Sequence, residues 1–289
     1  MKNVFGILLL FISLPAMVLA DEEEDITSTD GYILVWHDEF DNEGAPNALY
    51  WSCEEGFVRN KELQWYQSEN AWCRNGILTL TARKENRPNP NYNSKSHDWR
   101  KLRKNIYLSS ASITTKNKYE FLLGRFETRA RISGAPGTWP SIWLKGNKYA
   151  WPSCGEVDVL SFYRYHGEPS ILANVCWAGN EDTSEWDTSA HPLGRFLEND
   201  SLWLSKFHVW RMDWDQQAIR IYVDDQLLNE TSLTQTINAP TSKGADDNPF
   251  ESPLHIMLGL AMGSSGGYVY KETLPTLFEI DYVRVFQKL

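Results

Sequence analysis

Two carboxylates, Glu156 and Asp158, are the residues of this chain whose types and spacing best suit catalysis. They alternate with Val157 and Val159, and successive side chains of a β-strand point to opposite faces of the sheet. The pattern therefore predicts that the carboxylates share an open face while the valines pack in the core. Most glycosidases use a pair of carboxyl groups to cleave the glycosidic bond. Glu-x-Asp is also common on solvent-exposed strands, so the pair alone leaves a structural role open.

Aromatic residues surround this stretch. The chain holds 13 Trp, 13 Tyr and 12 Phe, and each buried indole N–H also needs a hydrogen-bond partner. The flat C–H faces of sugar rings stack on aromatic rings, so a surplus of Trp points towards carbohydrate. We expect Trp139, Trp143 and Trp151 to line a sugar-binding groove. For Trp143, which follows Ile142 in an apolar stretch, packing in the core is an equal alternative.

The elements that must position these residues are short strands. Period-two alternation predicts strands at residues 77–82, 126–132 and 219–223, separated by Gly, Asn, Asp and Pro clusters. No amphipathic helix longer than about ten residues is evident. Two polar stretches, residues 85–105 and 236–250, are predicted to be long loops. Many short strands with regular turn signals indicate a single all-β sandwich or barrel.

Several segments together resemble glycoside hydrolase family 16, the group of laminarinases, lichenases and agarases. Its active-site strand carries Glu-x-Asp-x-x-Glu, or Glu-x-Asp-x-Glu without a bulge, and the approach Trp-Pro-x-x-Gly-Glu at residues 151–156 is typical of laminarinase-like members. The other matching segments, in the family's order, are residues 36–40, 59–66, 124–129, 139–143, 207–214 and 280–285. The resemblance covers nearly the whole chain after residue 31. It implies a concanavalin A-like β-jelly-roll sandwich with a concave substrate groove.

The resemblance also implies roles for individual residues. Glu156 would be the nucleophile of a retaining mechanism, and Asp158 would orient it and tune its protonation. Asn60, Glu62 and Arg129 match positions that hydrogen-bond sugar hydroxyls or support the carboxylates. No cofactor is needed for catalysis.

The family's acid/base should follow on the same face, at residue 160 by plain alternation or at 161 across a β-bulge. Leu160 and Ser161 stand there, and neither can protonate a glycosidic oxygen. Positioned acid–base catalysis contributes about 10²–10⁴-fold, so impaired turnover is expected. Ser161 is either an engineered replacement or a natural loss, and Glu168 in the following loop is a weaker alternative acid. Gly259, where the family usually has Asn, is a second departure that favours natural loss.

A structural calcium is a further implication of the resemblance. Many family members bind one calcium on the convex side, and the matching positions lie near Glu39, Gly76 and Asp281. Backbone oxygens with one carboxylate suit this ion.

The N-terminus and the charge restrict location and partners. Lys2, the apolar residues 4–19 and the Val18-Leu19-Ala20 site predict a signal peptide over residues 1–20, then an acidic linker over 21–31 and one domain over 32–289. A secreted protein is expected, in the periplasm, at the cell surface or outside the cell. The net charge of −10 disfavours nucleic acid and anionic membranes. Four cysteines remain, and the local pairs Cys53–Cys73 and Cys154–Cys176 compete with free thiols.

The sequence thus predicts a secreted endo-β-glucanase-like protein, monomeric, whose partner is a β-linked polysaccharide or oligosaccharide. A glycan-binding protein of the same fold without turnover is the first alternative. The second is a sulfated-galactan hydrolase, agarase- or porphyranase-like, for which Arg59, Lys61 and Arg129 could supply the positive charge.

Overall fold

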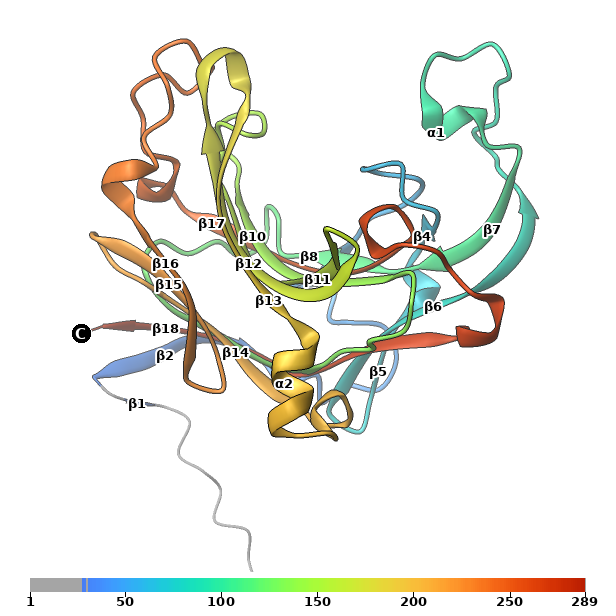
Figure 1. Ribbon diagram of the computed structural model, residues 1–289, viewed down its shortest axis with the longest axis horizontal. Coiled ribbons are helices and arrows are strands. Elements are labelled where there is room, and N and C mark those ends of the chain that lie inside the picture. The colour runs from blue at the N-terminus through green and yellow to red at the C-terminus, as the bar shows by residue number, and fades with distance from the viewer. Residues whose placement is uncertain (1–27, 30, 289) are drawn as a thin grey trace, which may run out of the picture.

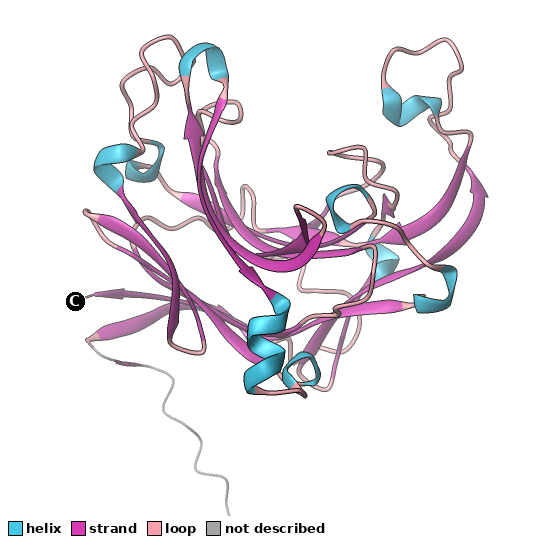
Figure 2. Ribbon diagram, in the orientation of Figure 1, coloured by secondary structure: helices cyan, strands magenta, loops and turns pink. Residues whose placement is uncertain are grey.

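The computed structural model describes residues 28, 29 and 31–288 and shows two β-sheets packed face to face (Figures 1 and 2). Neighbouring strands of the described residues run antiparallel, apart from β4 and β7. This is the β-jelly-roll sandwich that the sequence predicts. The predicted signal peptide lies outside the described residues.

The larger sheet has eleven strands in the described part of the chain, and most of them follow the order β16-β15-β14-β9-β18-β6-β7-β4. They are β1 (Ser28–Thr29), β2 (Tyr32–Asp38), β4 (Trp65–Tyr66), β5 (Ala71–Arg74), β6 (Ile77–Pro88), β7 (Asn105–Ser110), β9 (Gly124–Arg131), β14 (His208–Trp214), β15 (Ala218–Val223), β16 (Gln226–Ser232) and β18 (Thr276–Lys288). The predicted strands at 77–82, 126–132 and 219–223 correspond to β6, β9 and β15. β1 pairs with β2, so the sheet begins within the segment expected to be a linker.

Among the residues that the structure describes, the smaller sheet has seven strands in the order β13-β12-β11-β10-β17-β8-β3. They are β3 (Ser52–Cys53), β8 (Ser112–Thr114), β10 (Thr138–Gly146), β11 (Glu156–Tyr165), β12 (Glu168–Ala178), β13 (Ser184–Pro192) and β17 (Leu254–Met262). Its outer face curves inward in Figure 1, and the stretch with the two carboxylates forms β11, near its middle.

The core lies between the sheets and follows from alternation along the strands. In β14, buried and partly exposed residues alternate along its whole length, which places Trp210, Met212 and Trp214 against the smaller sheet. The strands of the smaller sheet contribute Val157, Val159 and other apolar residues to the same cluster. Burial of this apolar surface holds the smaller sheet in its curved shape on the larger one.

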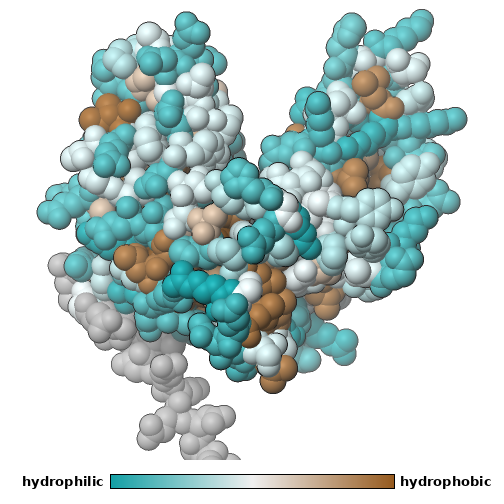
Figure 3. Space-filling view, in the orientation of Figure 1, coloured by the Kyte–Doolittle hydropathy of each residue, from teal (hydrophilic) through white to brown (hydrophobic). Residues whose placement is uncertain are grey.

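Helices are short, as the sequence predicts. The α-helices of the described residues are α1 (Trp99–Leu102) and α2 (Leu193–Asn199). The polar stretch 85–105, expected to be a loop, instead extends β6 to Pro88 and contains α1 before β7 begins. This excursion rises on one side of a deep hollow, and the turn between β12 and β13 rises on the other with the loop after β16 (Figures 1 and 3).

Candidate active site

The floor of the hollow is built on β11, where a β-bulge sets which residues face outward. Asp158 is opposite Asn174 on β12, and Ser161 is opposite Leu172. Between these two pairs β11 therefore contains one residue more than β12, which is the bulge. Val159 and Leu160 are both buried in the core as a result. Glu156, Asp158 and Ser161 all line the cleft, which has a volume of about 610 Å³. The predicted faces are therefore confirmed, and of the two positions that the sequence left open, 160 and 161, the structure places residue 161 in the cleft.

Ser161 is held by an aromatic neighbour. The Trp139 indole Nε1 donates a hydrogen bond of 2.8 Å to Ser161 Oγ, and the Trp139 ring lies 5.2 Å from the Tyr163 ring. Ser161 pairs across the strands with Ser141, which pairs in turn with Gly259 on β17. The floor at the third position is thus made of small residues that line the cleft.

Burial raises the pKa of both carboxyl groups of the Glu156–Asp158 pair, and the negative charge of Asp158 raises that of Glu156 further. Lys145, a hydrogen bond from the Trp151 side chain and Arg59 favour the ionised form of Glu156 but do not offset the burial. Asn174 Nδ2 donates to Asp158 Oδ2 at 2.8 Å and favours the ionised form of Asp158. A proton held by Glu156 and shared with an ionised Asp158 satisfies both groups.

Polar groups from the segment before β4 form one wall of the cleft. Glu62 is buried and accepts hydrogen bonds from Asn60 Nδ2 at 3.1 Å and from Gln64 Nε2 at 2.7 Å. The Arg59 guanidinium is ion-paired with Glu54 and lies 5.3 Å from the Trp143 ring centroid. Asn60 and Glu62 therefore reach the cleft as the sequence predicts.

The three predicted groove tryptophans all line the cleft. Trp151 is 44% exposed and lies 6.5 Å from the ring of Trp186 on β13. Trp143 is only 9% exposed although it lies on the cleft face opposite Asp158, and the Arg59 guanidinium lies near its ring. These rings offer flat apolar faces next to the carboxylates, as a sugar-binding cleft requires.

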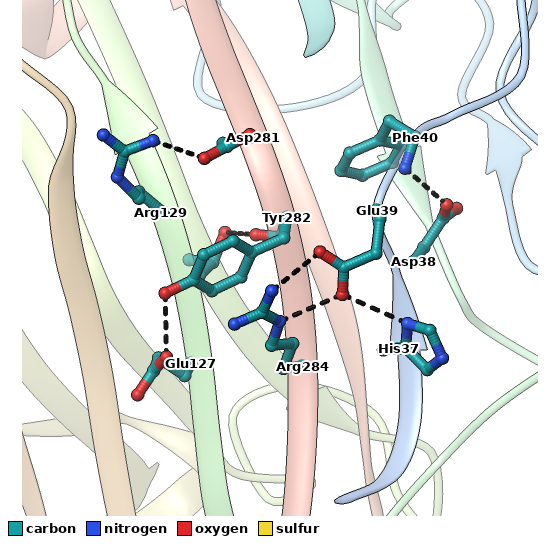
Figure 4. A network of polar contacts seen from close by, with 10 residues as sticks. His37, Asp38, Glu39, Phe40, Glu127, Arg129, Asp281, Tyr282 and Arg284 are labelled. Carbon is teal, nitrogen blue, oxygen red and sulfur yellow. Dashed lines mark hydrogen bonds and ion pairs between the residues drawn. The ribbon is translucent and has the colours of Figure 1, made fainter. Parts of the chain in front are cut away.

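Arg129 does not reach the cleft. It lies on β9 of the larger sheet, where alternation turns Thr128 into the core and Arg129 outward, and its guanidinium is ion-paired with Asp281 on β18 (Figure 4). The prediction that Arg129 binds sugar or supports the carboxylates therefore does not agree with its position. Lys61 is exposed and is not among the residues that line the cleft either.

The residues expected to bind calcium come together only in part. A Cβ atom added at Gly76 would lie 3.9 Å from the main-chain oxygen of Glu39, so these two positions are neighbours. The Glu39 carboxylate is held by Arg284 at 2.9 Å, and that of Asp281 by Arg129 (Figure 4). No group of three or more His, Cys, Asp or Glu side chains in the described residues could hold a metal. The Asp281 carboxylate, which would be the side-chain ligand, thus does not fit calcium while Arg129 is ion-paired with it.

Several cleft residues were not predicted. They are Tyr66, Ser141, Lys145, Tyr163, Asn174, Trp186, Thr188, Ala261 and Ser265. Ser141 and Lys145 could have been found by continuing the alternation from Trp139 and Trp143. Asn174 and Trp186 come from strands whose register with β11 is set by pairing over long distances.

Two further observations concern the chain as a whole. The four cysteines are free thiols, and of these only Cys53 is exposed. In the described part of the chain, no helix combines the length and apolar character needed to span a membrane.

Comparison with known proteins shows the family. Residues 59–284 match the model of glycosyl hydrolases family 16. A β-glucanase of Rhodothermus marinus is 30% identical over an alignment of 275 positions that covers 88% of this chain and 85% of that protein. A β-1,3-glucan-binding protein of Penaeus monodon is 26% identical over 56% of this chain and 48% of its own length.

Solved structures agree. A structure from work on endo-acting O-glycanases of the human gut microbiota has a TM-score of 0.77 at 30% identity, covering 91% of this chain and 93% of its own. The laminarinase catalytic domain of Thermotoga maritima has a TM-score of 0.71 at 28% identity, covering 90% of this chain and 100% of its own. With its cleft, its carboxylate strand and these matches, the chain belongs to glycoside hydrolase family 16.

Proposed function

We propose that this protein binds a β-glucan-type chain in the cleft and that Glu156 is a glycosidase nucleophile left without its acid/base partner. The observation that supports the proposal is the set of three cleft-facing positions on β11, filled by Glu156, Asp158 and Ser161. The relatives named as a β-glucanase and a laminarinase favour β-glucan as the substrate class.

The first chemical step would be attack by a Glu156 carboxylate oxygen on the anomeric carbon of a sugar held on the tryptophans. The bond from this carbon to the leaving oxygen breaks as the glycosyl–enzyme ester forms. Glu156 must be ionised for this step, and Asp158 can take over its proton through their shared hydrogen bond. The wall groups Asn60 and Glu62 offer a donor and an acceptor to the sugar hydroxyls.

The leaving oxygen of a natural glycan needs a proton at the same moment, and a serine hydroxyl is too weak an acid to supply it. The missing general acid–base contribution is about 10²–10⁴-fold, so we propose very slow hydrolysis of natural glycans. An aryl leaving group departs without a proton, and azide can attack the ester without a general base. With the aryl leaving group and azide, neither step needs an acid or a base at residue 161.

A glycan-binding protein without turnover is the second candidate. Its support is the hydrogen bond from Trp139 to Ser161, which fixes a stacking ring instead of presenting an acid. The relative named as a glucan-binding protein points the same way. The sulfated-galactan alternative loses two of its three basic residues, because Arg129 and Lys61 do not line the cleft.

The test compares the natural chain with Ser161→Glu on laminarin, mixed-linkage β-glucan, and an activated aryl β-glycoside with azide. The small side chains of Ser141 and Gly259 leave room for the longer carboxylate. Ser141→Glu is the matched control, because it adds a carboxylate to the same floor from the neighbouring strand. We expect glycan hydrolysis by Ser161→Glu alone, and azide-dependent turnover of the aryl glycoside by the natural chain.

If neither Ser161→Glu nor the azide assay gives turnover while oligosaccharides still bind, the enzymatic proposal is wrong and the binding protein stands. We also propose export after cleavage near Ala20. The N-terminal sequence of the protein recovered outside the cytoplasm tests this.

A further inference from the structure

A row of polar residues crosses the cleft floor beyond the catalytic strand. Lys145 on β10 pairs with Glu156 on β11 and, on its other side, with His255 on β17. Cross-strand partners point to the same face of a sheet. Since Lys145 and Glu156 both line the cleft, the His255 side chain lies on the concave side as well.

The Lys145 ammonium has no ionised partner in the part of the chain that the structure describes: no ion pair or hydrogen bond of its side chain is found there. Arg59, in the same cleft, is ion-paired with Glu54, and Lys148 nearby with Asp247. Lys145 acts electrostatically on its cross-strand neighbour Glu156, but no ion pair joins the two side chains. Lys145 is therefore a cation at the cleft surface without a dedicated counter-ion.

His255 does not balance the positive charge of Lys145. Its side chain is 2% exposed, and its Nδ1 atom has no hydrogen-bond partner. Its pKa is lowered to about 4, first by burial and then by the positive charges of Lys116 and Lys145. At neutral pH the ring is uncharged, so two lysines remain around it. This positive region stands out in a chain with a net charge of −10.

We propose that Lys145 binds an anionic substituent, a sulfate ester or a carboxylate, on a sugar docked beside Glu156, with Lys116 strengthening the positive potential. A lysine ammonium is a compact point charge on a flexible stem, which suits an anion whose position varies between sugars. The inference rests on the proposed function in one respect, that the cleft binds glycan. It assigns the substrate class of that cleft as anionic glycans.

Binding measurements by calorimetry test the assignment. The ligands are a laminari-oligosaccharide, a chemically sulfated preparation of it, and an oxidised preparation carrying uronic carboxylates. The proteins are the natural chain, Lys145→Met, which keeps the length of the stem, and Lys148→Met as the matched control outside the cleft. We expect the natural chain and Lys148→Met to bind at least one anionic ligand about ten-fold more tightly than the neutral one.

In Lys145→Met we expect this preference to vanish while neutral binding is kept. The sulfated and carboxylated arms show which anion is preferred. Equal weakening of neutral and anionic ligands by Lys145→Met would overturn the inference, because Lys145 would then act only through Glu156. Neutral binding without any anionic preference in the natural chain also overturns it and leaves the proposed function intact. Failure of every oligosaccharide to bind overturns both.

Discussion

Glu156→Gln should stabilise the fold at alkaline pH and have little effect in acid. The pKa of Glu156 is raised from 4.5 to about 8, through burial first and the charge of Asp158 second. Between these values the folded state keeps a proton that the unfolded state has released. The free energy of unfolding therefore falls as pH rises through this window, and the stability present below 4.5 is lost by about pH 8.

The size of the effect follows from the same groups. One pKa unit corresponds to about 1.36 kcal/mol, and solvent at the cleft surface reduces the cost of ionisation, so we expect a gain of about 2 kcal/mol near pH 8. The amide that Glu156→Gln introduces would keep an acceptor for Trp151 and gain a donor for Asp158, so no buried group is left unpaired. The gain should raise Tm by about 4 °C for a domain of this size.

Urea denaturation at several values between about pH 4.5 and about pH 8.5 measures the difference between the two proteins. Ser161→Ala is the control, because it alters the same floor without changing a titrating group. The difference for Glu156→Gln should grow with pH while that for Ser161→Ala stays flat. An offset independent of pH, or a less stable Glu156→Gln protein at alkaline pH, would refute the reasoning.

Three other predictions concern the site, the thiols and calcium. With an activated aryl glycoside and azide, kcat/KM should rise with pH along one limb, because Glu156 must lose its proton and residue 161 has none to lose; a descending alkaline limb would reveal another general acid. A thiol reagent should label Cys53 alone in the native protein and all four cysteines after denaturation, because the other three are buried; a second native label contradicts the structure. Calcium should raise the Tm of Arg129→Ala more than that of the unmodified protein, because the Asp281 carboxylate becomes available as a ligand only when Arg129 is removed. A Tm that calcium leaves unchanged in both proteins would count against the calcium site.

The faces of β11 could be predicted because they depend on local alternation. Val157 and Val159 mark the core side, and the carboxylates follow on the other. The bulge needed the family pattern, since nothing in Val159 or Leu160 distinguishes a bulged pair from a regular one. That pattern left residues 160 and 161 both open, and the structure places residue 161 in the cleft.

Arg129 shows what local patterns leave open. Alternation correctly turns its side chain out of the core, yet each sheet has its own outer face, and strand pairing decides to which sheet β9 belongs. Lys145 was missed for a related reason. Alternation from Trp143 turns this lysine to the open side of its strand, and its pairing with Glu156 and His255 shows that this side is the cleft floor.

The bulge at Val159 and Leu160 also constrains how this protein can evolve. Removing one residue there would send Ser161 towards the core and bring Phe162, now fully buried, to the surface. A change of chain length in this strand therefore changes which residues face the cleft, whereas replacement of the residue at 161 disturbs little beyond the Trp139 hydrogen bond. The chemical group that residue 161 presents to the cleft can thus change by substitution alone, while the strand register that shapes the cleft is inherited unchanged.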